Sequence, residues 1–300
     1  MHIIEAQQFD RVFLETLFAE ASTLKNKTSD CMRGKILASL FYEPSTRTRL
    51  SFESAARRVG GQVVGTENAH EFSSAVKGES LEDTIRIIGG YADVIVLRHN
   101  ENDAAGRAER VSSVPIINAG CGTGQHPTQG LLDLYTIWHE CKKIDGLTIA
   151  LAGDLKFGRT VRSLAYLLGK FDNVQILFVS PKELRVGGDI KEYLDRHRVA
   201  HKEVATLEEI IGDVDVLYQT RIQTERMQDK DEAKRLQAGA YRIDKKLASK
   251  MRLGAIIMHP LPRNDEIAPE VDELPSAAYF RQAQNGLYVR MALLQFLLEK

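Results

Sequence analysis

The stretch KILASLFYEPSTRTRLSFESAARRV, residues 35–59, contains the two elements from which the fold is predicted. Its first part, Lys35–Tyr42, is a mostly apolar run of strand length, which is typical of a strand buried on both faces. Its second part, Thr46–Val59, follows a Pro-containing turn and is predicted to be a helix. A buried strand that leads into a helix is the repeating unit of parallel α/β sheets.

The same alternation continues along the chain of 300 residues. Further strands are predicted at Gln62–Gly65, Val94–Leu97, Pro115–Asn118, Thr148–Ala152, Gln175–Val179, Val214–Tyr218 and Ala255–Met258. Other helices are predicted at Phe9–Leu24, Leu81–Gly90, Thr128–Cys141, Val161–Lys170 and Leu207–Ile211. Strands that alternate with helices favour parallel sheets covered on both faces, and such sheets bind ligands at the carboxyl ends of their strands.

The alternation restarts at Leu147, after a helix that can bridge two halves. The predicted fold class is therefore α/β, with two doubly wound parallel-sheet domains joined by bridging helices. We place the first domain at residues 1–140, together with a C-terminal helix at 284–300 that packs back on it. The second domain is placed at residues 141–283, and both sizes are ordinary for single domains.

The composition indicates a soluble globular protein, with 43% hydrophobic and 27% charged residues. The net charge of -1 provides no overall field for nucleic acid or an anionic membrane, so neither is expected as a partner. No apolar run approaches the roughly 20 residues that span a bilayer. The N-terminal sequence has no apolar core of a secretory signal, which favours a cytoplasmic location.

The three cysteines, Cys31, Cys121 and Cys141, show neither a CxxC pair nor a spacing with histidine that suits zinc. Reduced thiols are the simpler reading, because the count is low and odd. No metal site is predicted.

The segment Phe41–Arg49 is the strongest local signal of a binding site. A strand ends, a proline turns the chain, and hydroxyl residues open a helix whose free N–H groups form an anion site. Arg47 can bind a phosphate through two parallel hydrogen bonds. The alternative is an ordinary helix cap with solvated arginines, but two arginines and three hydroxyls exceed what a cap needs.

Two weaker signals lie in the same half. Gln125–Gln129 (QHPTQ) follows a Gly-rich turn and opens a helix, so that His126 and Gln129 lie three apart on similar faces. His126 could donate to a carbonyl oxygen, although the motif by itself favours a histidine that merely satisfies a turn. Arg98 comes directly after a predicted strand, where ligand groups belong in this fold class.

The second half contains three loops of interest. Gly153–Thr160 has the spacing of a phosphate-binding P-loop, but with Arg159 in the lysine position and no convincing Walker-B aspartate, so we interpret it as a turn that presents Arg159. Thr220–Gln223 places Arg221 and Gln223 after a strand, where they could bind a carboxylate. His259–Arg263 (HPLPR) contains prolines that leave nearby carbonyls available to a ligand, and ordinary loop chemistry is the alternative for both.

Together these segments resemble the catalytic chain of the aspartate carbamoyltransferase family, within the aspartate/ornithine carbamoyltransferase superfamily. The matches appear in the family's order from about residue 35 to 290: FYEPSTRTRLSFE, KGESLEDTI, RH, NAGCGTGQHPTQGLLDLYT, GDLKFGRTVRSL, TRIQTERM and HPLPRNDEI. STRTR and HPxQ are shared by all carbamoyltransferases, whereas GDLKxGRTV, TRxQxER and HPLPR are more specific to the aspartate enzymes.

The resemblance implies a carbamoyl phosphate site in the first half, formed by Ser45, Thr46, Arg47, Thr48, Arg98, His126 and Gln129. Arg98, His126 and Thr48 would donate to the carbonyl oxygen, and Gln129 would hold the amide. In the family, Ser73 and Lys77 lie on a loop that enters the neighbouring subunit's site, which implies a homotrimer with shared active sites. Whether a separate regulatory chain binds is left open by the sequence.

The resemblance also implies an aspartate site in the second half, formed by Arg159, Arg221, Gln223, Pro260, Leu261 and Pro262. The arginines and the glutamine would clamp the carboxylates, and the main-chain carbonyls of Pro260 and Leu261 would accept from the reacting NH₂ groups. The implied activity is carbamoyl transfer to aspartate, a step of pyrimidine biosynthesis.

In this acyl transfer the neutral amine attacks the carbonyl carbon and phosphate leaves, so fixed donors at the carbonyl oxygen should supply much of the rate. No covalent nucleophile, cofactor or metal is required, and the departing phosphate could accept the proton. Three alternatives remain: a carbamoyltransferase for another amine such as ornithine, a non-catalytic scaffold homologue, and a P-loop NTPase, which ATP binding would test. Acidic acceptor-site residues would favour the first alternative, and loss of a cation or of His126 the second.

Overall fold

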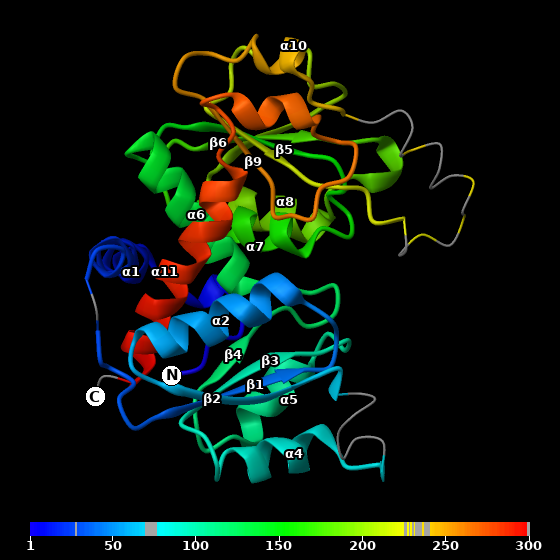
Figure 1. Cartoon of the computed structure of the whole chain (residues 1–300). Helices are drawn as coiled ribbons and strands as arrows, with labels where there is room; N and C mark the ends of the chain where they lie inside the picture. Colours follow the sequence, from blue (N-terminus) through cyan, green and yellow to red (C-terminus); the bar gives the residue numbers. More distant parts are fainter. Residues whose placement is uncertain are drawn as a thin grey trace. The chain divides into compact units, whose positions relative to one another are not determined.

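The computed structural model describes residues 1–27, 29–69, 77–224 and 241–298, together with Met227, Asp229, Asp231 and Leu236. The chain forms two compact units (Figure 1). Unit 1 contains Met1–Leu132 and Gln284–Lys300, and unit 2 contains Asp133–Ala283. The division between the units falls inside helix α6 (Pro127–Cys141).

Unit 1 is built on a four-stranded parallel sheet with the order β2-β1-β3-β4. Its strands are β1 (Ile36–Phe41), β2 (Gln62–Glu67), β3 (Val94–Arg98) and β4 (Ile116–Asn118). The chain passes from β1 to β2 on one side and then crosses to β3 and β4 on the other. The neighbours β1 and β3 therefore mark a topological switch point, where doubly wound sheets bind ligands.

Helices cover both faces of this sheet. Figure 1 shows α2 (Thr46–Arg58) on one face, and α4 (Leu81–Ile88) and α5 (Ala104–Val111) on the other. Helix α2 packs inward through apolar side chains including Phe52, which is fully buried. The unit is completed by η1 (Ala6–Gln8), α1 (Arg11–Leu24), the first turns of α6 and most of α11 (Tyr279–Leu298).

Unit 2 contains a five-stranded parallel sheet with the order β7-β6-β5-β8-β9. Its strands are β5 (Thr148–Ala152), β6 (Gln175–Val179), β7 (Ala200–Val204), β8 (Val216–Gln219) and β9 (Ile256–Met258). The winding direction reverses between β5 and β8, so these two strands mark the second switch point.

The two faces of this sheet are covered differently. Helices α7 (Arg159–Leu168) and α8 (Gly188–Arg196) lie on one face in Figure 1. The short helices α10 (Lys245–Ala248) and η5 (Pro269–Glu273) lie on the other, and η3 (Lys182–Leu184) follows β6. A buried apolar cluster that includes Leu217, Ile257 and Val271 fills the space under α10 and η5.

The predicted fold class is confirmed: both sheets are parallel, and helices flank them on both faces. One predicted helix is wrong, because Leu207–Ile211 forms turns. In so short a segment packing decides the conformation, and Leu207, Ile210 and Ile211 are buried in the apolar cluster of unit 2. Strand β7 was not predicted, because AHKEV is polar and lies at the edge of the sheet. Helices α5 and α8 were also not predicted.

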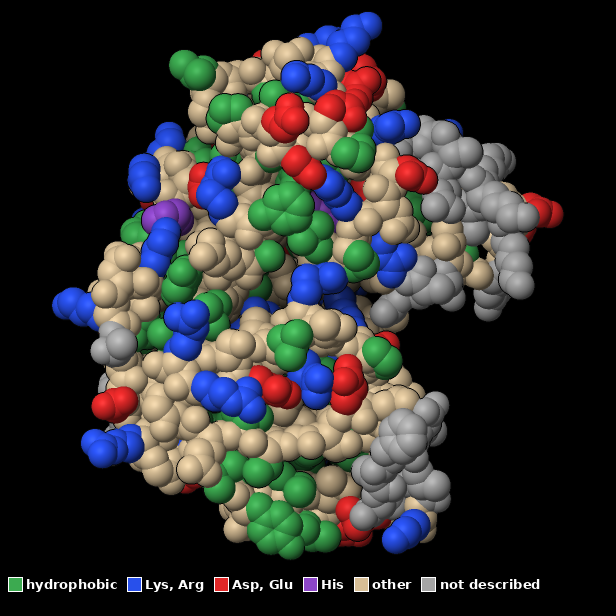
Figure 2. All heavy atoms as spheres, viewed as in Figure 1, with side chains coloured by type: hydrophobic (Ala, Val, Ile, Leu, Met, Phe, Trp, Pro, Cys, Tyr) green, Lys and Arg blue, Asp and Glu red, His purple; other side chains and the backbone are tan. Residues whose placement is uncertain are grey.

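The surface carries charges of both signs. Figure 2 shows lysine, arginine, aspartate and glutamate side chains interspersed on the visible face, in keeping with the net charge of -1. Cys31, Cys121 and Cys141, all among the described residues, form no disulfide bond with one another. Among the described residues, no helix is long and apolar enough to cross a bilayer. The same residues include no group of three or more His, Cys, Asp and Glu placed to hold a metal ion.

Candidate active site

The first candidate site begins where β1 ends and α2 starts. Phe41 and Arg98 are register partners, and the Tyr42 N–H donates to the Arg98 carbonyl at 2.9 Å. Ser45 is the N-cap of α2, yet within the described chain its side chain caps no N–H group. Ser80 at the start of α4 does so, accepting from the Asp83 N–H at 3.1 Å. The first N–H groups of α2 therefore remain available to an anion.

The other predicted residues of this segment lie on the first turn of α2. Thr46 and Arg47 are exposed, Ser45 is half-buried, and Thr48 is buried. Three hydroxyls and one guanidinium thus accompany the N–H groups at one helix start. This arrangement is suited to binding a phosphate.

Arg98 is held in place by two contacts at the carboxyl ends of the strands. Its Nη2 lies 2.9 Å from Glu43 Oε2, and its Nη1 donates to the Ala119 carbonyl at 3.3 Å. The side chain is largely buried, with 11% of it exposed. A buried guanidinium fixed in this way can act as a preorganised donor to a developing negative charge.

The loop between β4 and α6 is tied to the end of β3. The Gly122 N–H donates to the His99 carbonyl at 2.9 Å, and Gly122 has a φ of +53°. A Cβ atom at Gly122 would lie 1.9 Å from Asn102 Oδ1, so only glycine fits there. This packing fixes the chain a few residues before the start of α6.

His126 directly precedes α6 and is 4% exposed. Thr128 Oγ1 lies 3.4 Å from His126 Nδ1, and the His126 carbonyl accepts from the Gln129 N–H at 3.0 Å. Gln125 has a structural role instead, because it accepts from the Ala6 N–H at 2.8 Å and donates to Gln7 at 2.6 Å. His126 and Gln129 remain the members of this motif that are predicted to contact a ligand.

Two predicted residues belong to the segment before α4. Lys77 is exposed, and Ser73 lies outside the described residues.

The second candidate site is organised by Asp154, which is fully buried after β5. Its Oδ1 accepts from the Phe157 N–H at 2.9 Å, and its Oδ2 accepts from the Gln223 N–H at 3.1 Å. Its own N–H donates to Thr220 Oγ1 at 3.0 Å. One carboxylate thereby joins the loop that leads to Arg159 to the loop that carries Gln223. Sequence reasoning assigned Asp154 no role.

The glycines of the P-loop-like segment serve close packing rather than phosphate binding. Gly153 has a φ of +103°, and a Cβ there would lie 2.3 Å from the Thr220 carbonyl oxygen. The N–H groups of Asp154, Leu155 and Phe157 are all bonded within the protein. A phosphate cradle needs free N–H groups, so a nucleotide-binding P-loop is excluded.

The loop after β9 is organised by His259 and Glu266. His259 Nε2 lies 2.8 Å from Glu266 Oε1, and the Leu261 N–H donates to His259 Nδ1 at 2.8 Å. Leu261 has a φ of +54°. The Asn264 N–H lies 3.2 Å from both Glu266 oxygens. Burial acts to raise the pKa of Glu266, but the hydrogen bonds from His259 and the main chain outweigh it and lower the pKa.

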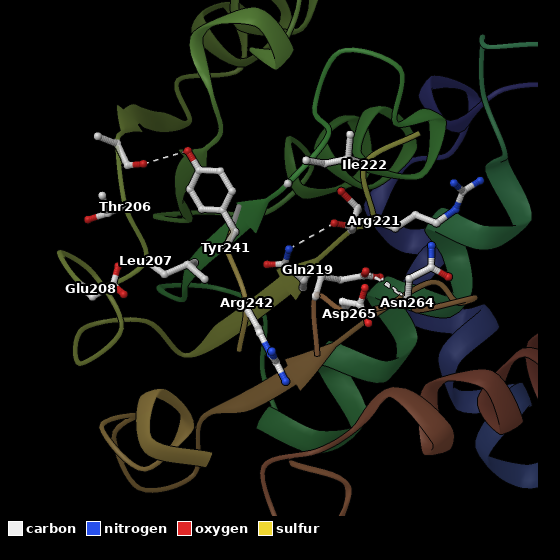
Figure 3. Close-up of a pocket in the computed structure, with 14 residues that line it drawn as sticks. Thr206, Leu207, Glu208, Gln219, Arg221, Ile222, Tyr241, Arg242, Asn264 and Asp265 are labelled. Atoms are coloured by element: carbon white, nitrogen blue, oxygen red, sulfur yellow. Dashed lines mark hydrogen bonds between the residues drawn. The ribbon is translucent and has the colours of Figure 1, made fainter. Parts of the chain in front are cut away.

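A pocket of about 570 Å³ opens between these loops of unit 2 (Figure 3). Its lining includes Gly153, Thr220, Arg221, Asn264 and Glu266. In Figure 3 the Tyr241 hydroxyl points toward the Ala205 carbonyl, to which it donates at 2.9 Å, whereas Arg242 points another way. The pocket brings Arg221 and the β9 loop to one place.

The residues that sequence reasoning missed are Glu43, Asp154, His259 and Glu266. All of them lie inside the motifs FYEPSTRTR, GDLKFGR and HPLPRNDEI, so the sequence indicated the segments that contain them but not their roles. Glu43 pairs with Arg98, and Asp154 accepts from the distant Gln223 N–H, and only the folded chain identifies these two contacts. His259 contacts Glu266 and the Leu261 N–H within its own loop.

Two family models together match most of the chain. Residues 1–139 match the model described as aspartate/ornithine carbamoyltransferase, carbamoyl-P binding domain. Residues 145–297 match the one described as aspartate/ornithine carbamoyltransferase, Asp/Orn binding domain. The chain is 54% identical to the chloroplastic aspartate carbamoyltransferase of Arabidopsis thaliana over 301 residues, which covers 99% of this chain and 77% of the relative.

Solved structures give the same result. The catalytic subunit of M. jannaschii aspartate transcarbamoylase is 50% identical with a TM-score of 0.91, and the match covers 99% of this chain and 98% of that chain. The Trypanosoma cruzi aspartate transcarbamoylase in complex with N-(phosphonacetyl)-L-aspartic acid is 40% identical with a TM-score of 0.94, covering 99% and 95%. Another structure of the T. cruzi enzyme contains carbamoyl phosphate and aspartate. The resemblance stated from the motifs is confirmed.

The prediction of a cytoplasmic location is wrong, because similar plant enzymes are chloroplastic. Neutral overall charge and unpaired cysteines suit any reducing aqueous compartment, so composition could not separate the two locations.

Proposed function

The chain belongs to the aspartate/ornithine carbamoyltransferase family, and we infer that it transfers the carbamoyl group of carbamoyl phosphate to the amino group of L-aspartate. The products are N-carbamoyl-L-aspartate and phosphate, in a step of pyrimidine biosynthesis. The choice of aspartate as the acceptor is supported by the side chains on the loops at the second switch point, between β5 and β8. Arg159, Arg221 and Gln223 come from two loops that Asp154 joins, and these side chains suit a dicarboxylate.

Carbamoyl phosphate is assigned to unit 1. We place its domain at residues 1–140 with 284–300, which also takes in the part of α6 at residues 133–140 that the contacts group with unit 2. The phosphate binds at the uncapped start of α2, through Ser45, Thr46, Arg47 and Thr48. Arg98 and His126 donate with Thr48 to the carbonyl oxygen, where charge grows during attack. Gln129 holds the amide. The contacts of Arg98 with Glu43 and Ala119 support this assignment, because they hold the guanidinium rigidly.

Aspartate is assigned to unit 2, and residues 141–283 form its domain. Arg159, Arg221 and Gln223 bind its carboxylates through charge-assisted and amide hydrogen bonds. The carbonyls of Pro260 and Leu261, next to Pro262, accept from the reacting NH₂ groups. The attacking amine must be neutral, and the leaving phosphate takes up its proton. Catalysis then consists of orientation and of stabilising charge on the carbonyl oxygen.

The choice of acceptor is tested by assaying ureido product from carbamoyl phosphate with either aspartate or ornithine. Product is expected from aspartate alone. Replacing Arg221 by glutamine should lower kcat/KM for aspartate by about 10²-fold, since a charge-assisted pair contributes roughly 1.5–3 kcal/mol. Arg185→Gln is the matched control, because Arg185 is half-exposed in the same unit and pairs with Glu203 at 3.1 Å. Product from ornithine would overturn the acceptor assignment, and a folded, inactive chain would favour the scaffold alternative.

A homotrimer with shared active sites is the second part of the proposal. Its support is the motif KGESLEDTI, which starts at Lys77 and resembles the family's intersubunit loop. An equal mixture of Lys77→Ala chains and Arg98→Ala chains, allowed to reassemble, should regain up to about a quarter of wild-type activity. This is the fraction of shared sites that receive an intact Arg98 from one subunit and an intact Lys77 from its neighbour. Each variant alone should be nearly inactive. A mixture that reassembles but stays inactive would contradict shared sites.

A further inference from the structure

His259 is 1% exposed and is the first residue of the loop that carries Pro260 and Leu261, two of the proposed substrate contacts, but His259 itself has no role in the proposed reaction. Its main-chain N–H donates to Gln282 Oε1 at 2.8 Å. Gln282 Nε2 in turn donates to Asp133 Oδ1 at 2.6 Å. The backbone of His259 is therefore anchored inside unit 2, and this anchoring fixes the position from which its imidazole ring extends.

Both ring nitrogens of His259 have partners within the same loop. Because Nδ1 accepts the Leu261 N–H, the proton of a neutral ring lies on Nε2 and is donated to Glu266 Oε1. Glu266 also accepts the Asn264 N–H. The ring thus ties the start of the loop to its middle and its end. With both nitrogens engaged, the ring is not placed to act as a general base.

Leu261 lies in the left-handed region, with a φ of +54°, which residues other than glycine rarely adopt. Such a conformation persists only when surrounding contacts determine it, and these conformations gather at functional sites. Here the hydrogen bond from the Leu261 N–H to His259 Nδ1 is the contact that holds it. The same dihedral angles set the directions of the carbonyls before and after Leu261 Cα.

We propose that His259 and Glu266 form a positioning pair that aims the main-chain carbonyls of Pro260 and Leu261 at the reacting NH₂ groups. This inference rests on the proposed function, which assigns those carbonyls to the substrates. Neither side chain of the pair needs to touch a substrate. The pair acts by keeping one strained backbone conformation, in which both carbonyls are held before the substrates bind.

The test compares turnover with the binding of N-(phosphonacetyl)-L-aspartate in His259→Ala. This analogue keeps the two carboxylates, a phosphonate and the aspartate nitrogen as an amide N–H, but it lacks the carbamoyl NH₂ and therefore one of the two contacts with the carbonyls. A misplaced carbonyl should therefore lower kcat on the order of 10²-fold, the loss typical of a 1 Å misplacement, while analogue affinity changes only a few-fold. His259→Asn should recover much of the turnover, because its Oδ1 can replace Nδ1 as the acceptor for the Leu261 N–H.

His201→Asn is the matched control, since His201 also pairs with a carboxylate in unit 2, at 3.0 Å from Asp195, and should keep full activity. If His259→Ala fails to fold, Glu266→Gln provides the same comparison. Unchanged kcat in His259→Ala or Glu266→Gln, or a parallel loss of kcat and analogue affinity, would overturn the positioning role. Failure of the proposed function is separate, because the unaltered chain would then form no carbamoyl aspartate.

Discussion

Replacing Arg98 by methionine is expected to lower kcat by about 10²–10³-fold, the usual loss when one donor to a developing oxyanion is removed. The guanidinium is held between Glu43 and the Ala119 carbonyl, so it requires little reorganisation when charge grows on the carbonyl oxygen. Methionine keeps a long apolar stem, and the Glu43 side chain, 32% exposed, can be solvated by water. Steady-state kinetics with carbamoyl phosphate and aspartate, together with an unfolding curve, measure both effects.

Arg86→Met is the matched control for this variant. Arg86 lies in the same unit, its side chain is 58% exposed, and it pairs with Asp83 at 3.1 Å. Activity should stay within about twofold of the unaltered chain, because exposed pairs of this kind contribute little. If Arg98→Met kept more than about a tenth of kcat, the donor role of Arg98 would be wrong.

Replacing Asp154 by asparagine is expected to lower kcat/KM for aspartate by about 10²–10³-fold, because both acceptor loops lose their common anchor. The carboxylate accepts from two N–H groups, and an asparagine has only one oxygen for them. The unmatched buried N–H should also lower the free energy of unfolding by about 1–3 kcal/mol. Calorimetric titration should still show carbamoyl phosphate binding to unit 1 with unchanged affinity.

The control for this second variant is Asp195→Asn, since the Asp195 side chain is 71% exposed in the same unit. Its effect on both kinetics and unfolding should be small. Equal losses of carbamoyl phosphate binding and aspartate turnover in Asp154→Asn would show a general collapse and would contradict a local anchoring role.

The fold was predictable from sequence wherever burial dominates. Strands such as Val94–Arg98 and Thr148–Ala152 are apolar on both faces, and their length and spacing indicate a parallel sheet. The edge strand β7 and the turns at 207–211 were not predictable in this way. Their conformation is set by pairing with β6 and by packing against the sheet, and neither of these is encoded in local periodicity.

Some residues of the candidate site could be predicted from the sequence and others could not. The predicted ligand contacts, such as Arg47 at the start of α2 and Arg221 after β8, are recognisable because charged residues just beyond a buried strand are typical of a binding site in this fold class. Asp154 accepts from the N–H of Gln223, 69 residues further along the chain, and Glu266 contacts His259 Nε2, so no local residue pattern predicts their roles. The residues that support a site can be identified only from the tertiary structure, whereas the residues proposed to contact the ligand can be predicted from the sequence.

The two switch points have a consequence for the way in which acceptor preference can diverge. Strand pairing of β1 with β3 and of β5 with β8 uses main-chain groups only, while most of the proposed ligand contacts lie on loops and helix starts beyond the strands. Side chains on the loops after β5 and β8 can therefore be exchanged without disturbing either register. An ancestor with this architecture could keep one carbamoyl donor and acquire new amines by altering a handful of loop positions, so that one half of the chemistry stays fixed while the other diversifies.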